Sequence, residues 1–376
     1  MKILYLFAEE DSFMFKWQRF NIFDELSHHG IDIDVFNPLC NKSEKTDFEA
    51  FRDSLFRNHE YDLFMTCHGD DTIDKRYLDC IKTYGIPSVL ICFDNLHEPF
   101  QHKRIAKEFD LVWITSIETK NMFEKWGCTN IVFQPYAANP YAFESNTPIR
   151  TDNFRVCFIG TPYGSRVNKI NYLTLNKIPV NLYTNQIGSD NSTRADTVCS
   201  WISNRRTLQR IIPYLSFEIG RKVLYSALKN KLMSTSHLLD INSYLHQLSS
   251  VSFEEMIRIY RKTALSLNIS ELRNTFVLKN PIHKLHLRTF EIPMAGGLEF
   301  CSYTPEIVEY FKDGEEIVTY DNMEELVDKA TFYTKPTNSS VVDKMKDAAL
   351  NRAKKEHTWY NRFSLIFNKL ELKLYD

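Results

Sequence analysis

The chain has 376 residues, of which 43% are hydrophobic and 14% aromatic, enough to build a core in each of two domains. Its formal net charge of -2 gives no general attraction to nucleic acid, so no nucleic-acid partner is expected and any anion site must be local. Scattered cysteines without a C-x-x-C pair, the lack of a secretory signal after Met1 and the lack of a long apolar run favour a reduced, cytoplasmic protein without a membrane span.

Residues 1–148 alternate between short apolar runs and amphipathic segments, which is the pattern of a doubly wound parallel sheet. The expected strands are KILYLFA, IDIDVFN, DLFMTCH, PSVLICFD, LVWITS and NIVFQPY. Between them, residues 47–57 and 71–85 place apolar side chains at helical spacing. We therefore expect a Rossmann-like domain whose ligand-facing loops follow the carboxyl ends of its strands.

A stretch rich in Asn, Pro, Ser and Thr separates this domain from residues 149–355, where the same alternation restarts with RVCFIG and PVNLYT. A helical insertion at about 190–249 interrupts the second domain, and residues 356–376 are expected to form a helix that packs back across the domains. The predicted fold class is α/β, with two Rossmann-like doubly wound domains that face a cleft.

The insertion is locally basic between residues 201 and 233. Its cations, interleaved with apolar residues, are Arg205, Arg206, Arg210, Arg221, Lys222, Lys229 and Lys231. Such a segment can contact anionic lipid as a peripheral membrane element, or it can guide an anionic acceptor. An ordinary solvated face of a helical insertion explains the same pattern.

The turn after the first strand of each domain differs in its capacity to hold phosphate. The first, LFAEEDSFMF, has no glycine and carries three acids, so it would repel a pyrophosphate. The second, FIGTPYGSR, has Gly160 directly after the strand, and Arg166 and Lys169 follow within reach of an anion. We therefore expect any phosphate site in the second domain.

The stretch HLRTFEIPMAGG supplies a second basic group. A helix that begins near Leu287 places Arg288 and Glu291 on one face, where a guanidinium suits phosphate oxygens and a carboxylate suits ribose hydroxyls. If the regular helix starts near Thr289, Pro293 falls in its first turn, where a missing amide costs little. The alternative is an ordinary surface Arg–Glu pair.

The series VCFIGTPYGSR, LSLNIS, KLHLRTFEIPMAGGLEFCSYTPEIVEYFKDGEEIV and HTWYNR resembles the CgeB-like, spore-maturation-type branch of GT-B glycosyltransferases over most of residues 154–365. The resemblance implies that the second domain binds a nucleotide sugar and the first domain binds the acceptor, without a metal or other cofactor. The donor-site residues that it implies are Gly160, Arg166, His283, Lys284, His286, Arg288 and Glu291.

Within that set, Arg166 and Arg288 would contact the diphosphate, Glu291 the ribose, and Gly160 the phosphates through its backbone. His283 stands eight positions before Glu291, where many related retaining enzymes carry a second glutamate that touches the donor sugar. The departure leaves the stereochemical outcome open.

The predicted function is transfer of a sugar, of the hexosyltransferase type, from a nucleoside diphosphate sugar to an acceptor hydroxyl. The acceptor would be a glycan, a lipid-linked molecule or a protein, in the synthesis of O-antigen or another surface polysaccharide or glycoconjugate, and the protein would work in the cytoplasm or at the inner face of the membrane. The alternatives are a nucleotide-sugar epimerase or hydrolase of the same architecture and a non-catalytic nucleotide-sugar-binding protein.

Candidate bases for the acceptor hydroxyl stand where strands of the first domain end. Asp94 and His97, in CFDNLHEP, are preferred as catalytic residues over the acids and histidine of TCHGDD. Asp32 and Asp34 alternate with apolar residues in a strand, so they do not indicate a metal site.

Overall fold

The computed structural model describes residues 1–10, 13–41, 46–57, 60–96, 101–185, 211–212, 214–233 and 238–373. The chain divides into two compact units. The first comprises Met1–Ala142, Ile212–Gly220 and Trp359–Asp376, and the second comprises Phe143–Ile211 and Arg221–Thr358. The sequence predicted independently folding domains with limits at 148/149 and 355/356. A division into compact units does not test independent folding, so these limits stay a prediction.

The first unit contains a six-stranded parallel sheet in the order β2-β1-β3-β4-β5-β6. Its strands are β1 Lys2–Leu6, β2 Asp32–Phe36, β3 Leu63–Thr66, β4 Ser88–Cys92, β5 Leu111–Ile114 and β6 Ile131–Phe133. All residues of β3, β4 and β5 are buried, as is usual for parallel strands covered on both faces. The six strands predicted for this half of the chain are confirmed.

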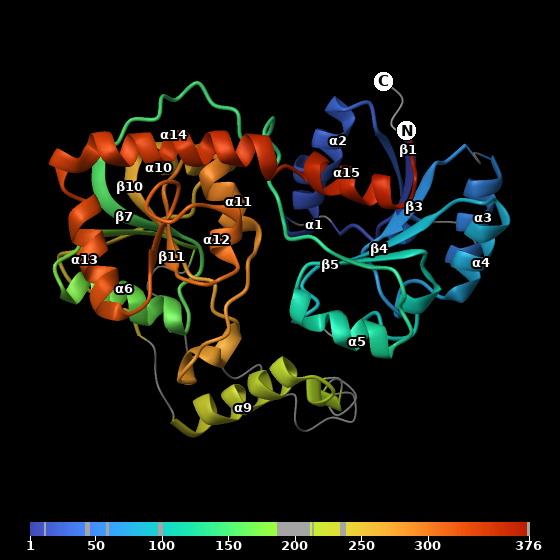
Figure 1. Cartoon of the computed structure of the whole chain (residues 1–376), viewed down its shortest axis with the longest axis horizontal. Coiled ribbons are helices and arrows are strands. Elements are labelled where there is room, and N and C mark those ends of the chain that lie inside the picture. Colours follow the sequence, from blue (N-terminus) through green and yellow to red (C-terminus); the bar gives the residue numbers. More distant parts are fainter. Residues whose placement is uncertain are drawn as a thin grey trace. The chain divides into compact units, whose positions relative to one another are not determined.

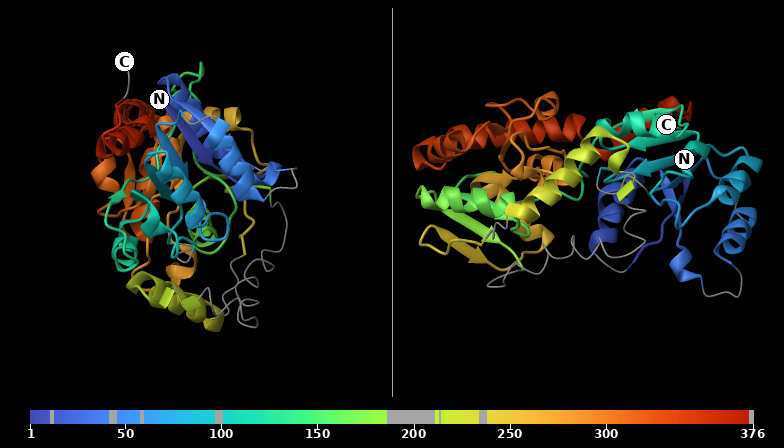
Figure 2. Two further views of the ribbon diagram at one scale, coloured as in Figure 1. Left: turned by 90° about the vertical axis from the view of Figure 1, so that its right-hand side faces the viewer. Right: turned by 90° about the horizontal axis from the view of Figure 1, so that it is seen from below.

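Helices of the first unit lie along this sheet (Figures 1 and 2). They are α1 Phe13–Gln18, the π-helical segment Arg19–Phe23, α2 Asp24–His28, α3 Asp47–Arg57, α4 Lys75–Thr83, α5 Lys120–Lys125 and α15 Trp359–Lys369. The segments 47–57 and 71–85, chosen for their helical spacing, correspond to α3 and α4. Phe51 and Leu55 of α3, and Tyr77 and Ile81 of α4, are buried as that spacing requires.

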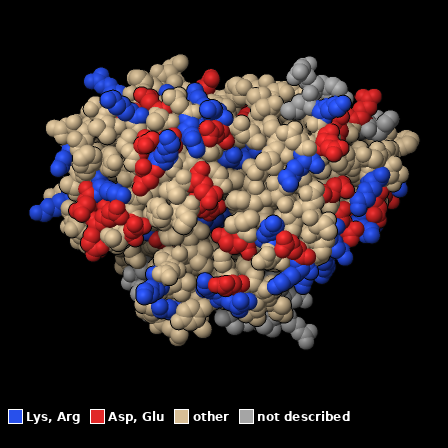
Figure 3. Space-filling model, viewed as in Figure 1, with Lys and Arg blue, Asp and Glu red and all other residues tan. Residues whose placement is uncertain are grey.

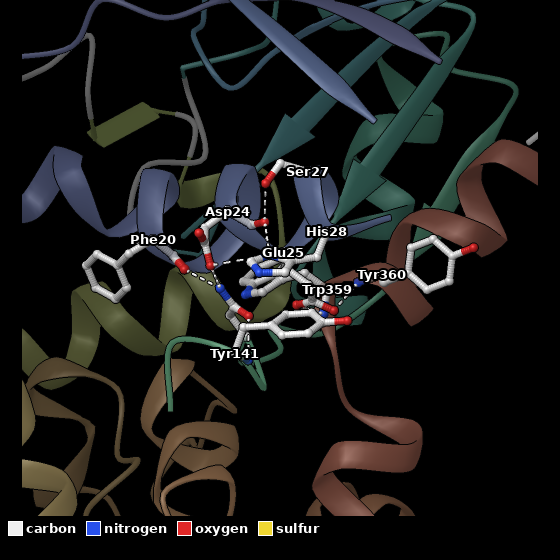
Figure 4. A network of polar contacts seen from close by, with 9 residues as sticks. Phe20, Asp24, Glu25, Ser27, His28, Tyr141, Trp359 and Tyr360 are labelled. Carbon is white, nitrogen blue, oxygen red and sulfur yellow. Dashed lines mark hydrogen bonds and ion pairs between the residues drawn. The ribbon is translucent and has the colours of Figure 1, made fainter. Parts of the chain in front are cut away.

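The first unit includes α15 although this helix comes from the far end of the sequence, and a buried carboxylate holds its start (Figure 4). Glu25 of α2 is 0% exposed. Its two carboxylate oxygens accept hydrogen bonds from the backbone N–H groups of Trp359, at 3.0 Å, and Tyr360, at 2.9 Å. Because the first amides of a helix have no partner within the helix, Glu25 satisfies them and meets the positive end of the helix dipole.

The second unit contains a six-stranded parallel sheet in the order β12-β11-β10-β7-β8-β9. Its strands are β7 Asn153–Ile159, β8 Val180–Tyr183, β9 Leu245–Leu248, β10 Thr263–Asn268, β11 Glu299–Ser302 and β12 Val318–Tyr320. The edge strand β9 pairs with β8, so the expectation of a helical insertion up to residue 249 is wrong at its end. The four residues of β9 are mostly exposed or half-buried and therefore give little strand signal in the sequence.

Helices cover both faces of this second sheet: in Figure 1, α6 and α13 lie on one side and α10, α11 and α14 on the other. The helices of this unit are α6 Ser165–Leu175, α10 Phe253–Lys262, α11 Leu287–Met294, α12 Ile307–Tyr310, α13 Met323–Tyr333 and α14 Ser339–Glu356. A further helix, α9 Glu218–Met233, begins in the first unit and continues in the second from Arg221. Of the expected insertion, α9 is the main described part, and Arg205, Arg206 and Arg210 lie outside the described residues.

Charged side chains of both signs are interspersed over the face shown in Figure 3, in keeping with the formal net charge of -2. Within the described residues, no helix combines the length and the apolar character needed to cross a bilayer.

Removal of the Glu25 carboxylate should loosen the attachment of α15. We expect Glu25→Ala to lower the free energy of unfolding of the first unit by roughly 2–4 kcal/mol, because two buried amides lose a charged acceptor, and Glu25→Gln to cost about half as much. Urea unfolding followed by tryptophan fluorescence measures this, since Trp113 and Trp359 both lie in this unit. The exposed Glu60→Gln is the matched control, and equal stability of Glu25→Ala and the control would refute the assignment.

Candidate functional site

The second sheet reverses its direction of winding between β7 and β10. β7 comes first in this unit, β8 pairs with one edge of it, and the chain later returns to place β10 against the other edge. In open parallel sheets, ligands bind beyond the carboxyl ends of the strands at such a switch point. Residues 160–164, after β7, and residues 269–286, after β10, therefore border the best-placed ligand site of this unit.

Gly160 stands directly beneath the guanidinium of Arg288. Its φ is 144°, which disfavours any residue with a side chain, and a Cβ here would lie 3.3 Å and 3.4 Å from the two terminal nitrogens of Arg288. The Gly160 N–H donates to the carbonyl of Tyr183 at 2.9 Å. The amide expected to contact phosphate thus already has a partner, and what Gly160 contributes is room for the guanidinium.

The two arginines singled out from the sequence come together over one aromatic ring. The guanidinium carbon of Arg166 lies 5.7 Å from the ring centre of Phe158, and that of Arg288 lies 5.9 Å from the same centre. Arg166 also stacks on Tyr163, at 4.3 Å, and donates to the Thr161 carbonyl at 3.0 Å. Burial lowers the pKa of Arg166, and the nearby charge of Arg288 lowers it further while Tyr163 opposes both.

Arg288 differs from Arg166 in its lack of polar partners. Within the part of the chain that the structure describes, its guanidinium makes no hydrogen bond or ion pair. Its donors are therefore available for an anion, and two neighbouring cations make that anion favourable.

α11 begins at Leu287, as expected, so Arg288 is in its first turn and Glu291 lies one turn later. Glu291 is half-buried; burial raises its pKa to about 7, against the opposing effect of Arg288. The expectation that Pro293 lies in the first turn is wrong, because the helix starts at Leu287 and Pro293 is its penultimate residue. The helix ends at Met294, and Gly296, whose φ is 81°, follows the C-cap residue Ala295.

Lys169 was expected to face an anion, but it forms a buried ion pair with Glu271. Burial raises the pKa of Glu271, but Lys169 outweighs this effect and leaves that pKa below its usual value. His283 joins the same cluster: it forms a backbone bridge with Glu271, and its Nδ1 lies 3.2 Å from the Ser270 hydroxyl. Burial lowers the pKa of His283, and the carboxylate of Glu271 works against this.

Lys284 and His286 belong to the connection that leads into α11. Lys284 is buried, and its backbone N–H donates to the Ser270 carbonyl at 3.0 Å. His286 has an extended backbone directly before α11, and its carbonyl accepts from the Thr289 N–H at 3.0 Å. The structure thus brings Gly160, Arg166 and Arg288 together, with His283 in the neighbouring Lys169–Glu271 cluster, whereas Lys284 and His286 fix the path of the chain.

In the first unit, Asp94 follows β4 in a conformation that a non-glycine residue seldom adopts, with φ 52°. The residue is exposed, and its Oδ1 accepts a hydrogen bond of 3.0 Å from the buried hydroxyl group of Tyr136. His97, the other preferred base, lies outside the described residues. The structure therefore holds the Asp94 carboxylate in a defined place, and its role stays a prediction.

Two of the three less favoured bases of TCHGDD, His68 and Asp70, make structural contacts. His68 Nε2 accepts the Ala8 N–H at 2.8 Å, and burial lowers its pKa to about 4. Asp70 accepts the backbone N–H groups of Arg104 and Ile105 at 2.9 Å and 3.1 Å.

Sequence reasoning missed Glu299, which is 0% exposed at the start of β11. Its Oε1 accepts from the Asn268 amide at 2.6 Å, and burial raises its pKa to about 8 although Asn268, Cys301 and Arg288 oppose the rise. Only the acid within the apolar run GGLEFCS could have drawn attention to it. While it is neutral, Glu299 does not compensate the positive charge of Arg288.

Residues 228–368 match a family model described as glycosyl transferase-like, which covers less than half of the chain. No curated protein sequence is significantly similar to this chain. Within the described residues, no group of three or more His, Cys, Asp or Glu side chains is arranged to hold a metal ion.

Solved structures resemble the chain over almost its whole length. Alr3699/HepE of Anabaena, in complex with UDP-glucose, is 13% identical, with 99% of each chain covered and a TM-score of 0.56. An α-glucosyltransferase in complex with UDP and DNA is 11% identical, with 99% of each chain covered and a TM-score of 0.59. Sucrose-phosphate synthase of Thermosynechococcus elongatus is 12% identical, covers 98% of this chain and 99% of that one, and has a TM-score of 0.51.

At such identities these matches show the fold alone. Two Rossmann-like parallel sheets, matched over the whole chain by glycosyltransferases, make this a fold of the GT-B type, so the predicted fold class is confirmed.

The buried Glu299 should give the second unit a distinct dependence on pH. Its pKa is raised in the folded state, so its contribution to stability is complete below about pH 4.5 and is lost as the pH rises through about 8. Glu299→Gln keeps the acceptor for Asn268 without the charge. We expect it to match the wild type near pH 4.5 and to be more stable above pH 8, by at most about 5 kcal/mol.

Urea unfolding at several pH values measures this difference, with the exposed Glu324→Gln as control. A Glu299→Gln protein that is less stable than the wild type above pH 8 would contradict the assignment.

Proposed function

We propose that the protein is a glycosyltransferase that moves a sugar, of the hexosyl type, from a nucleoside diphosphate sugar to an acceptor hydroxyl. The observation that carries this proposal is the pair of guanidiniums, Arg166 and Arg288, gathered over Phe158 at the switch point of the second sheet. The GT-B fold and the match of residues 228–368 to a glycosyl transferase-like model support the same function.

In this reaction the bond between the anomeric carbon and the diphosphate oxygen breaks, and the nucleoside diphosphate leaves with the electron pair. Arg288, whose donors are available, and Arg166, which Phe158 and Tyr163 hold in place, stabilise the charge that develops on the leaving oxygens. Arg166 is held in place before the substrate arrives, so it needs little reorganisation. Glu291, one turn along α11 from Arg288, is the proposed partner of the ribose hydroxyls.

The donor to examine first is UDP-glucose, because the structure of Alr3699/HepE contains it. His283 is the proposed contact for the donor sugar, held through Ser270 and Glu271. Lys284 and His286 support this site by fixing the approach to α11. No step of the proposed reaction uses a metal, since the arginines supply the positive charge.

The acceptor is proposed to bind to the first unit, and to be a glycan, a lipid-linked molecule or a protein in the synthesis of O-antigen or another surface polysaccharide or glycoconjugate. If the reaction inverts the anomeric carbon, a base must take the proton of the acceptor hydroxyl, and Asp94 or His97 is the proposed base. We also propose that the protein works in the cytoplasm or at the inner face of the membrane. The cysteines within the described residues are all free thiols, which suits a reducing compartment.

Replacement of Arg288 tests the donor site. We expect Arg288→Ala to weaken UDP binding about 30- to 100-fold, because charge-assisted hydrogen bonds to the diphosphate are lost. Arg288→Lys should fall in between, since an ammonium cannot form the paired contacts of a guanidinium. Isothermal titration calorimetry measures these affinities.

The matched control is Arg258→Ala, which removes an exposed arginine of α10 in the same unit. The proposal fails if Arg288→Ala binds UDP as tightly as Arg258→Ala does, or if the wild type binds no nucleoside diphosphate.

Replacement of the proposed bases separates chemistry from donor binding. We expect either Asp94→Asn or His97→Asn to reduce the rate of sugar transfer at least ~100-fold while UDP affinity stays unchanged. Radiolabel transfer from UDP-glucose to glycan and glycolipid extracts measures the rate. If both variants transfer sugar at the wild-type rate, neither residue is the base, and if label is released only as free sugar, the protein is a hydrolase.

A further inference from the structure

One side of α9 is buried, and from Arg221 onward the helix belongs to the second unit. From Arg221 onward, the side chains of Val223 and Ser226 are buried on this side. The Lys229 ammonium donates a hydrogen bond to the carbonyl of Val277, in the second unit, at 2.8 Å. The helix is therefore held by its inner side and keeps its opposite side for other contacts.

The opposite side carries an exposed apolar stripe. Tyr225 is 59% exposed, Leu228 is 56% exposed and Leu232 is 77% exposed. These residues are three and four positions apart, so at 3.6 residues per turn they lie above one another along a single line of the helix. A helix of a globular protein normally packs its apolar stripe against the core. An apolar stripe that is exposed to solvent therefore indicates a contact surface.

Positive charges border this stripe on both sides. At 3.6 residues per turn, Lys222 and Lys231 lie roughly 90° to either side of it, and Arg221 lies in line with it one turn earlier. All three are exposed, and the helix contains no acidic residue after Glu218. Long basic side chains beside an apolar stripe can extend to phosphate groups while the stripe enters an apolar layer.

We propose that α9 lies in the plane of an anionic lipid bilayer, with Tyr225, Leu228 and Leu232 among the acyl chains and Lys222 and Lys231 at the lipid phosphates. The charge pattern favours a bilayer as the binding partner. A protein that bound this stripe would need acidic groups along both of its borders, whereas an anionic bilayer presents negatively charged phosphate groups at every position. This inference rests on the proposed location at a membrane and identifies α9 as the part of the protein that contacts the lipid. Membrane binding does not require sugar transfer, so it can be tested without measuring activity.

The test is co-sedimentation of the full-length protein with vesicles. We expect binding to vesicles of phosphatidylcholine with phosphatidylglycerol, weak binding to phosphatidylcholine alone, and weakening of binding by salt. The double variant Leu228→Ser and Leu232→Ser should bind anionic vesicles at least about tenfold more weakly. Lys222→Glu with Lys231→Glu should lose the preference for anionic lipid.

Leu175→Ser is the matched control, since Leu175 is 65% exposed at the end of α6 in the same unit. It should bind vesicles as the wild type does, and the affinity of every variant for UDP should be unchanged, which keeps this test separate from that of the donor site. The proposal is overturned if the wild type does not bind anionic vesicles, or if the Leu228 and Leu232 variant binds them as well as the control. It is also overturned if the wild type forms a dimer that this variant abolishes and neither protein binds lipid.

Discussion

The repulsion between two cations is the interaction on which the second unit's site depends. Arg166 and Arg288 lie over the same ring, Phe158, and the positive charge of one lowers the pKa of the other. A fold tolerates such a pair when an anion binds there during function or when an acid neutralises it. Two acids interact with Arg288: Glu299, with a pKa of about 8, is mostly neutral at pH 7, and Glu291, with a pKa of about 7, is about half ionised. The structure thus keeps the pair available for a negatively charged ligand.

The surrounding architecture makes room for this pair and neutralises a neighbouring lysine. The switch point between β7 and β10 brings the turn at Gly160 next to α11, and the missing side chain of Gly160 leaves the space that the Arg288 guanidinium occupies. Lys169, which could have been a third cation, is neutralised by Glu271. In the first unit, Glu25 uses its charge in another way, as a buried acceptor that fixes the start of α15. In the arginine pair and in Glu25 alike, the role of a charged side chain depends on the groups that the fold places beside it.

The sequence predicted the sheets well and the site in part. Apolar runs such as those of β3 and β4 are unambiguous because every residue is buried, whereas β9 is short and half-exposed and was taken for part of an insertion. Helical spacing correctly placed Arg288 and Glu291 one turn apart. It could not reveal the Lys169–Glu271 pair, because those residues are distant in sequence and meet only through the crossing from β7 to β10. Nor could it show that Gly160 uses its own amide within the sheet.

The most direct test of the donor site is a crystal structure of the protein with UDP. The account predicts that the diphosphate lies against α11, with its oxygens within hydrogen-bond distance of the guanidiniums of both Arg166 and Arg288, and that the ribose faces Glu291. A nucleotide bound elsewhere, or a diphosphate that contacts neither guanidinium, would contradict it.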